Sequence, residues 1–172
     1  MGDKATGLDL ALAARAKERT AIEDAEERTA AFVVFELAGE AFAIEGNYIK
    51  AVLPMTEPFR VPACPPSLEG VVLYQGEIES VIDISGVIGR APLPKAGSRA
   101  ILLGQTDAMR SGIRVDRVVD VALVPESALA DAPKTIGEAL RDKASKVVER
   151  RGGLVPVLDL PAVFAAWERG EE

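Results

Sequence analysis

Two aspartates, Asp83 and Asp159, come closest to a catalytic pair in this sequence. They hold matching places in a segment that occurs twice, as GEIESVIDIS at 76–85 and as GGLVPVLDLP at 152–161. Two carboxylates can divide the work of general acid and general base. Each aspartate also follows an expected strand and precedes a turn or helix, where a short acidic side chain commonly accepts hydrogen bonds from backbone amides. A carboxylate-dependent enzyme and a pair of structural caps are therefore the two interpretations.

Other chemistry is limited by what the sequence lacks. It contains no histidine, which removes Ser-His-Asp and Cys-His arrangements and most zinc sites. Cys64 is the only cysteine, so an intrachain disulfide is impossible and a thiolate metal site is disfavoured. Neither a Walker loop nor a GxGxxG turn occurs. We therefore expect no catalytic residues, no cofactor and no metal.

Composition excludes further classes of protein. The 172 residues carry a net charge of −7 and a pI near 4.8, and nucleic-acid binding usually demands a basic stripe. An OB-like oligonucleotide binder would also need exposed aromatics on a basic face. No apolar run approaches the roughly 20 residues of a membrane helix, and MGDKATGLDL lacks the apolar core of a signal peptide. The expected location is the cytoplasm.

The elements that would position Asp83 and Asp159 fall into two similar sets. FAIEGNYIKAVLP, ending at Pro54, is echoed by IRVDRVVDVALVP, ending at Pro125, at nearly the spacing of the aspartate segments. A period of this length indicates two similar small units rather than a solenoid. A duplicated shape without a duplicated reactive group favours a binding protein.

The first 31 residues differ from the rest. LDLALAARAKERTAIEDAEERTA is rich in Ala, Glu and Arg, which predicts a helix from about Leu8 to Arg28. Its apolar face is thin, while i,i+4 pairs such as Arg19 with Glu23 can support a solvated helix. The segment is either a loosely attached extension or a docking helix for a partner or a second copy.

From Phe32 the pattern becomes short strands and turns. FVVFEL and AFAIE predict a hairpin, a third strand runs from Ile49 to Leu53, and five prolines between 54 and 66 predict an irregular loop. GVVLYQGEIESVIDI predicts a second hairpin that turns at QG. A transition at about 85–98 leads to the second set, with a helical turn near 136–143, a closing hairpin that turns at 151–153 and a C-terminal helix.

The C-terminal helix has a clear beginning. Pro161 suits a first helical position and Asp159 lies close enough to cap it. Val163, Phe164 and Trp167 share one face, which we expect to pack on the strands. Many short strands in two sets predict an all-β protein of two small barrels that share part of their core, since each set alone is too small for a stable fold. The junction between them is a natural groove for a partner.

Five landmarks follow one another along the chain: FVVFELAGEAFAIEGNYIKAVL, VP at 61–62, GVVLYQGEIESVIDI, GIRVDRVVDV and LVPVLDL. In this order they resemble the CheW-like coupling proteins of bacterial chemotaxis and the related regulatory domain of the kinase CheA. The resemblance implies an N-terminal extension (1–31) and a CheW-like domain (32–168) with two five-stranded SH3-like barrels around a shared hydrophobic core. It also implies a non-catalytic adaptor between the cytoplasmic tip of a methyl-accepting chemoreceptor and the regulatory domain of a CheA-type histidine kinase, recruited to membrane-associated receptor arrays.

The sequence departs from the family where such contacts are expected. The family's NLRG turn is LYQG here, and its third strand has lost an acidic residue at Ala51. In the family, the glutamate of the third strand and the arginine of the turn can lie close enough to pair, and here they are Ala51 and Gln75. Either this neutral pair has replaced the ion pair with little consequence, or the adaptor serves different receptors or a kinase pathway other than motility. The resemblance nominates six partner-facing residues: Ile49, Ala51, Leu73, Tyr74, Gln75 and Gly76.

Overall fold

The computed structural model describes residues 13–15, 28–94 and 100–171. Its strands are β1 (Thr29–Leu37), β2 (Glu40–Glu45), β3 (Ile49–Pro54), β4 (Leu68–Tyr74), β5 (Glu77–Ile82), β6 (Ala100–Gln105), β7 (Arg110–Val115), β8 (Arg117–Pro125), β9 (Leu129–Asp131), β10 (Lys146–Arg150) and β11 (Gly153–Leu158). Helix α2 (Leu160–Glu168) follows, and three 3-10 turns are η1 (Gly46–Tyr48), η2 (Glu126–Ala128) and η3 (Glu138–Leu140). The helix predicted over 8–28 lies outside the described residues, except for the helical stretch 13–15.

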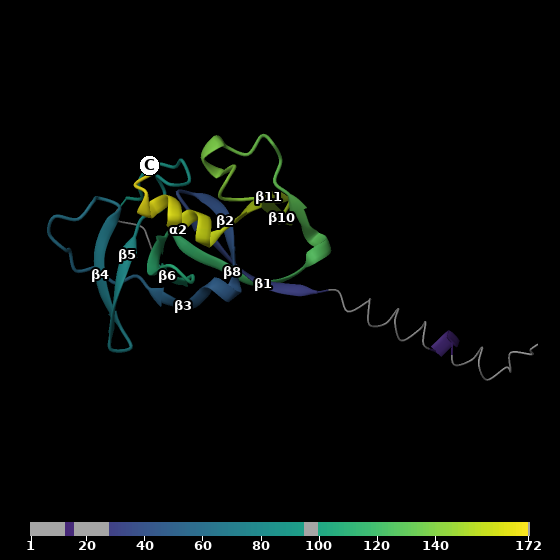
Figure 1. Ribbon diagram of the computed structural model, residues 1–172, viewed down its shortest axis with the longest axis horizontal. Coiled ribbons are helices and arrows are strands. Elements are labelled where there is room, and N and C mark those ends of the chain that lie inside the picture. Colours follow the sequence, from purple (N-terminus) through teal and green to yellow (C-terminus); the bar gives the residue numbers. More distant parts are fainter. Residues whose placement is uncertain (1–12, 16–27, 95–99, 172) are drawn as a thin grey trace, which may run out of the picture.

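The described strands form two sheets. Sheet A has the order β8-β1-β2-β11-β10-β9, and sheet B has the order β3-β6-β7-β5-β4. Figure 1 shows β4 and β5 at one end of the molecule and β10 and β11 at the other, with α2 lying between them. The all-β prediction is confirmed. Sheet B has the five strands expected of each unit, whereas sheet A gains a sixth because the three-residue β9 pairs with β10.

The internal repeat appears as an exchange of hairpins between the sheets. Hairpin β1–β2 joins strands from the second half of the chain, and hairpin β6–β7 joins strands from the first half. Each hairpin has one antiparallel and one parallel junction with those strands. The parallel junctions are in matching register, with Val157 opposite Ala43 in sheet A and Val81 opposite Gly112 in sheet B. Each sheet therefore takes strands from both sides of the boundary predicted near 85–98. The boundary near 85–98 between the two barrel subdomains stays a prediction.

Strand β1 is buried on both faces because it lies between two cores. Phe35 and Leu37 face a shared core that includes residues of both sheets and α2. Phe32 and Val34 point the other way, into a second cluster made by sheet A alone. Burial on both faces explains why FVVFEL is a continuous apolar run rather than an alternating one.

Helix α2 closes the shared core from one side. Asp159 is its N-cap and accepts a hydrogen bond from the backbone N–H of Ala162 at 3.1 Å, as the sequence predicted. Phe164 is fully buried, and a Cβ on Gly104 of β6 would meet its ring at 3.2 Å. The absence of a side chain at Gly104 thus lets the helix pack directly against sheet B. The helical turn predicted near 136–143 is the short η3.

Candidate functional site

The hairpin β4–β5 presents four of the six nominated residues. Gln75 and Gly76 form its turn with φ angles of 49° and 84°, the left-handed pair that a two-residue hairpin turn requires. Beside the turn, Leu73 on β4 lies opposite Ile78 on β5. These side chains are 75% and 74% exposed. Two large apolar side chains paired across strands in solvent indicate a contact surface rather than a core.

A groove runs beside this hairpin on sheet B. It has a volume of about 490 Å³, and Leu53 of β3, Val71 and Leu73 of β4 and Ile101 of β6 line it together with Phe59. Strands β3 and β4 are opposite edges of the sheet, so the sheet must curve to bring both to one groove. Most of this lining is apolar, which suits an apolar partner surface.

The proline-rich loop reaches β4 through a single bridge. Phe59 and Val71 exchange backbone hydrogen bonds of 2.8 and 2.9 Å, and the Phe59 side chain remains 78% exposed. Gly70 makes this approach possible, since its φ is +146° and a Cβ there would lie 2.3 Å from the Phe59 carbonyl oxygen. The loop therefore carries a third exposed apolar side chain to the edge of the groove.

The six nominated residues do not gather at one place. Leu73 and Tyr74 line the groove, and Gln75 and Gly76 form the turn. Ile49 instead packs against the shared core, and Ala51 is half-buried beside an irregularity in the pairing of β3 with β6. Of the nominated set, the structure joins the hairpin residues and leaves the β3 residues outside the groove lining.

Sequence reasoning missed Ile78 and Phe59. Ile78 shares a strand face with Ile82, which is fully buried, so alternation alone assigns it to the core. It is exposed because β5 pairs with β7 only at Val81 and Ile82, and the hairpin extends beyond that pairing. Phe59 had one available signal, an aromatic residue inside a loop that prolines keep at the surface.

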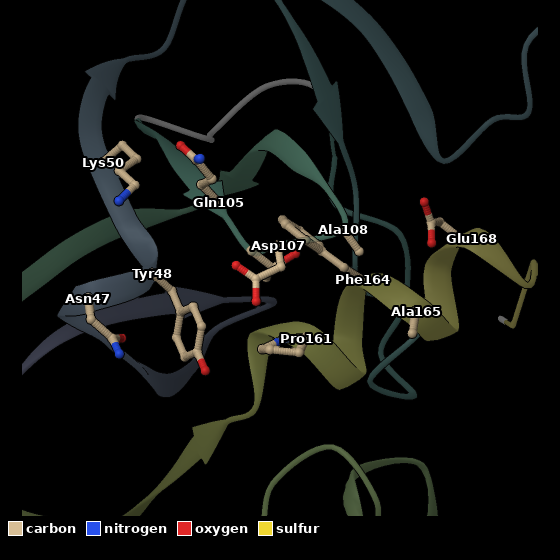
Figure 2. Close-up of a pocket in the computed structure, with 11 residues that line it drawn as sticks. Asn47, Tyr48, Lys50, Gln105, Asp107, Ala108, Pro161, Phe164, Ala165 and Glu168 are labelled. Atoms are coloured by element: carbon tan, nitrogen blue, oxygen red, sulfur yellow. The ribbon is translucent and has the colours of Figure 1, made fainter.

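A second pocket lies where η1, the β6–β7 turn and α2 meet. Its volume is about 350 Å³. Figure 2 shows Tyr48 and Pro161 on one side, Asp107 from the β6–β7 turn near the centre, and Glu168 at the far end of α2. The pocket is lined by η1, sheet B and the helix, and it mixes polar with apolar side chains. Because η1 connects β2 of sheet A with β3 of sheet B, this pocket is the candidate for the partner groove that the sequence predicts at the junction.

The two repeated aspartates serve separate structural tasks. Asp83 accepts hydrogen bonds from the backbone N–H groups of Ser85 at 2.9 Å and Leu93 at 3.1 Å. Asp159 caps α2. Both carboxylates therefore hold backbone in place, which is the capping interpretation. Within the described residues, no group of three or more acidic or cysteine side chains could hold a metal ion, and no helix is long and apolar enough to cross a membrane.

A buried cation organises the loop that follows β5. Arg114 is 2% exposed and donates hydrogen bonds to the carbonyl oxygens of Pro94 at 2.9 Å and Leu93 at 3.0 Å. It also forms ion pairs with Glu69 at 2.5 Å and Asp83 at 3.5 Å. A buried charge requires such partners, so this arginine ties β4, β7 and the loop together.

Perturbed pKa values occur at surface pairs away from the hairpin. The hydrogen bond from Arg117 lowers the pKa of Glu36, and the hydrogen bond from Lys146 lowers the pKa of Asp131. Both pairs join strands of sheet A: β1 with β8, and β9 with β10. These shifts indicate cross-strand ion pairs rather than groups prepared for proton transfer.

Comparison with known proteins gives a consistent result. The family model described as "CheW-like domain" matches residues 31–168. "Chemotaxis protein CheW" of Bacillus subtilis (strain 168) is 28% identical over 136 residues, covering 77% of this chain and 85% of that protein. The protein of the same name from Thermotoga maritima is 24% identical over 130 residues, covering 76% and 84%. The crystal structure of the scaffolding protein TtCheW from Thermoanaerobacter tengcongensis superposes with a TM-score of 0.67 at 23% identity, covering 80% of this chain and 93% of that one.

Proposed function

The chain belongs to the CheW-like domain family, and we propose that it is a non-catalytic adaptor that couples chemoreceptors to a CheA-type histidine kinase. The named relatives are chemotaxis proteins, and the matched structure is a scaffolding protein. An adaptor acts by binding two partners at once, so it needs surfaces rather than a reactive group. In this proposal residues 32–168 form the adaptor domain, and residues 1–31 are an extension.

The observation that carries the proposal is the exposed apolar pair of Leu73 and Ile78. Burying each of these side chains against a partner would contribute about 1.5–3 kcal/mol. Phe59 at the edge of the adjoining groove adds a third anchor. Interfaces commonly draw most of their binding energy from such a small cluster. We assign this surface to the regulatory domain of the kinase, a barrel protein of similar shape.

The junction pocket is the proposed site for the receptor. The tip of a chemoreceptor is a helical hairpin, and a groove between two packed units can hold a helix. The pocket draws on η1, the β6–β7 turn and α2, so a bound helix would touch sheet B, α2 and the segment that links the two sheets. Two separate surfaces would let one molecule hold receptor and kinase together, in the cytoplasm and at receptor arrays.

The kinase contact is tested with a matched pair of variants. Leu73→Asp and Leu154→Asp each place a carboxylate on an exposed hairpin, because Leu154 of β11 is also 59% exposed. Binding of the full chain to an isolated CheA-type regulatory domain is measured by titration calorimetry. We expect Leu73→Asp to weaken binding by at least about 30-fold, the size of a hot-spot loss. Leu154→Asp should leave it within about twofold. Equal losses, or no binding by the unaltered chain, would contradict the proposal.

The changed turn favours one variant of this function. Gln75 and Ala51 stand where the family resemblance places an arginine and a glutamate, so in this form of the proposal the chain prefers a kinase outside the motility pathway. Binding to regulatory domains from a motility kinase and from a non-motility kinase is compared, with Ala51→Glu/Gln75→Arg as the restored form. This form of the proposal is supported if the unaltered chain prefers the non-motility domain and the restored form prefers the motility domain. A preference unaffected by the restoration contradicts it.

Self-association through the N-terminal segment is a separate part of the proposal. A helix with a thin apolar face and many charges can pair with a second copy. Light scattering on the full chain and on a form beginning at Arg28 measures this directly. A dimer that needs the first 27 residues supports the proposal, and a monomer in both forms contradicts it.

A further inference from the structure

A large pocket lies at the C-terminal end of α2, away from the β4–β5 hairpin. It is formed where the loop before β4, the loop after β5 and the C-terminal end of α2 meet, and its volume is about 640 Å³. Figure 1 shows the C-terminal end of α2 near the loop that follows β5. A volume of this size is within the range of sites that hold small ligands or a few residues of peptide.

Two buried donors distinguish this pocket. Among the described residues, the indole Nε1–H of Trp167 and the Nε–H of Arg90 are buried without a hydrogen-bond partner. Both side chains line the pocket. A buried donor without an acceptor costs free energy, and native structures rarely leave one without a reason. A ligand with acceptor groups for both donors would remove this free-energy cost at each of them.

The acceptor should be uncharged. The charge of Arg90 is already paired with Glu40 at 2.7 Å, and its Nη1 donates to the carbonyl oxygens of Ile88 and Gly89. Glu168 also lines the pocket, and its negative charge disfavours an anion. Glu171 lines the pocket as well, but its charge is paired with Lys143 and Arg169. The carbonyl oxygen of an amide is the uncharged acceptor that fits these conditions.

The remaining walls are apolar and firmly held. Pro65, Pro66, Pro92 and Val87 line the pocket beside the Trp167 ring. The two loops are joined by the hydrogen bond from Asp83 N–H to the Ser67 carbonyl oxygen at 2.8 Å. A preformed site made of proline and tryptophan suits an extended peptide, which loses little conformational entropy when it docks.

We propose that this pocket binds an uncharged, apolar peptide segment of a protein partner, whose backbone carbonyl oxygens accept hydrogen bonds from Trp167 and Arg90. Both donor atoms are sealed from solvent, so this proposal requires the Trp167 and Arg90 side chains to turn toward the pocket when the segment binds. The site does not involve the β4–β5 hairpin, and it shares only Glu168 with the junction pocket. It therefore does not depend on which kinase or receptor the adaptor serves.

The single tryptophan makes the test direct, since the full chain gives one indole N–H resonance in a ¹⁵N–¹H spectrum. The probe is the N-acetylated, C-amidated peptide Ala-Pro-Pro-Ala. We expect it to move that resonance saturably, with a dissociation constant on the order of 1 mM for so small a ligand. Arg90→Lys keeps the charge opposite Glu40 but removes the Nε–H, and it should weaken binding about fivefold.

Two further variants separate hydrogen bonding from packing. Trp167→Phe keeps an aromatic ring and removes the N–H, and binding read from the Val87 methyl resonances should weaken about tenfold. Tyr48→Phe in the junction pocket is the matched control and should bind like the unaltered chain. The proposal is overturned if the probe leaves the indole resonance unmoved, or if both pocket variants bind normally. It is also overturned if N-acetylglycinate binds as well as the neutral peptide, or if a bound water alone satisfies the indole.

Discussion

The hairpins β4–β5 and β10–β11 repeat each other in backbone. Gln75 and Gly76 turn the first with φ angles of 49° and 84°, and Arg151 and Gly152 turn the second with φ angles of 49° and 78°. Both are two-residue connections in which both central residues have positive φ, the geometry that matches the twist of paired strands. The duplication therefore preserved the turn, although only its glycine is the same residue in both copies.

The surfaces of these hairpins differ where the backbones agree. Next to the turn, Leu73 faces Ile78 in the first hairpin, and Glu149 faces Leu154 at the matching place in the second. One hairpin thus exposes an apolar pair, and the other pairs an apolar residue with a charge. The backbone does not determine which hairpin can bind an apolar partner; a few outward side chains do.

The interiors of the two sheets differ as well. The cluster enclosed by sheet A is entirely apolar: Phe32, Val34, Ala43, Ala122, Val124, Val148 and Val155. In sheet B, Glu79 holds the place of Val155 and pairs with Arg110, and Arg114 is buried nearby. Buried ion pairs add little net stability but are costly to break. Sheet B therefore uses charge to position its loops, whereas sheet A relies on apolar packing.

The largest expected effect comes from breaking the buried charges of sheet B. Arg114→Met leaves the carboxylates of Glu69 and Asp83 without their cation in a buried place and should lower the free energy of unfolding by about 3–5 kcal/mol. Denaturant titration measures this. At the corresponding position of sheet A, Glu45→Gln changes a half-buried surface residue and should cost less than about 0.5 kcal/mol. Similar losses for the two variants would remove the contrast between the interiors.

The next effect concerns a shift in the pairing register of β4 with β5 between Leu68 and Gly70, which the hairpin β10–β11 does not have. Gly70→Ala places a Cβ against the Phe59 carbonyl oxygen at a backbone angle that favours glycine. It should cost about 2–4 kcal/mol. Lys146 holds the matching place in β10, where the pairing is regular, and Lys146→Ala should cost at most about 1 kcal/mol. If thermal unfolding shows Gly70→Ala to be as stable as the unaltered chain, the loop does not depend on this close approach.

The sequence predicted local elements well because their signals are local. The turns at Gln75 and Gly76, the strand from Ile49, the cap at Asp159 and the all-β class each follow from a few neighbouring residues, and all are present in the structure. The exchange of hairpins between sheets could not be predicted in this way. It depends on which distant strands pair, and the apolar pattern of β1 is compatible with either partner.

The proposed contact surface was predicted only in part for a related reason. The family resemblance pointed to the turn and so to Leu73. The exposure of Ile78 depends on where β7 stops pairing with β5, which no pattern within β5 records. Ile49 was nominated from the same resemblance, yet it packs on the shared core. A nominated residue becomes a contact only if the surrounding strands leave it uncovered.

The smallest expected effect tests the ion pairs that sheet A carries across its strands. Arg117 on β8 lowers the pKa of Glu36 on β1 below its ordinary value of 4.5. Because the folded protein binds this proton less readily than the unfolded chain, the pair stabilises the fold above that value. The contribution is lost as the pH falls through the lowered pKa. A surface pair of this kind contributes at most about 1 kcal/mol.

Glu36→Gln should therefore be slightly less stable than the unaltered chain at neutral pH, and the difference should shrink as the pH falls below 4.5. Denaturant titrations across this range measure it. Glu77→Gln on β5 is the comparison, because it removes an exposed ion pair with Arg110 in sheet B. Added salt should reduce the difference at neutral pH, since solvent-exposed charges are screened. A difference that persists in acid would mean that Glu36 acts through packing and not through its charge.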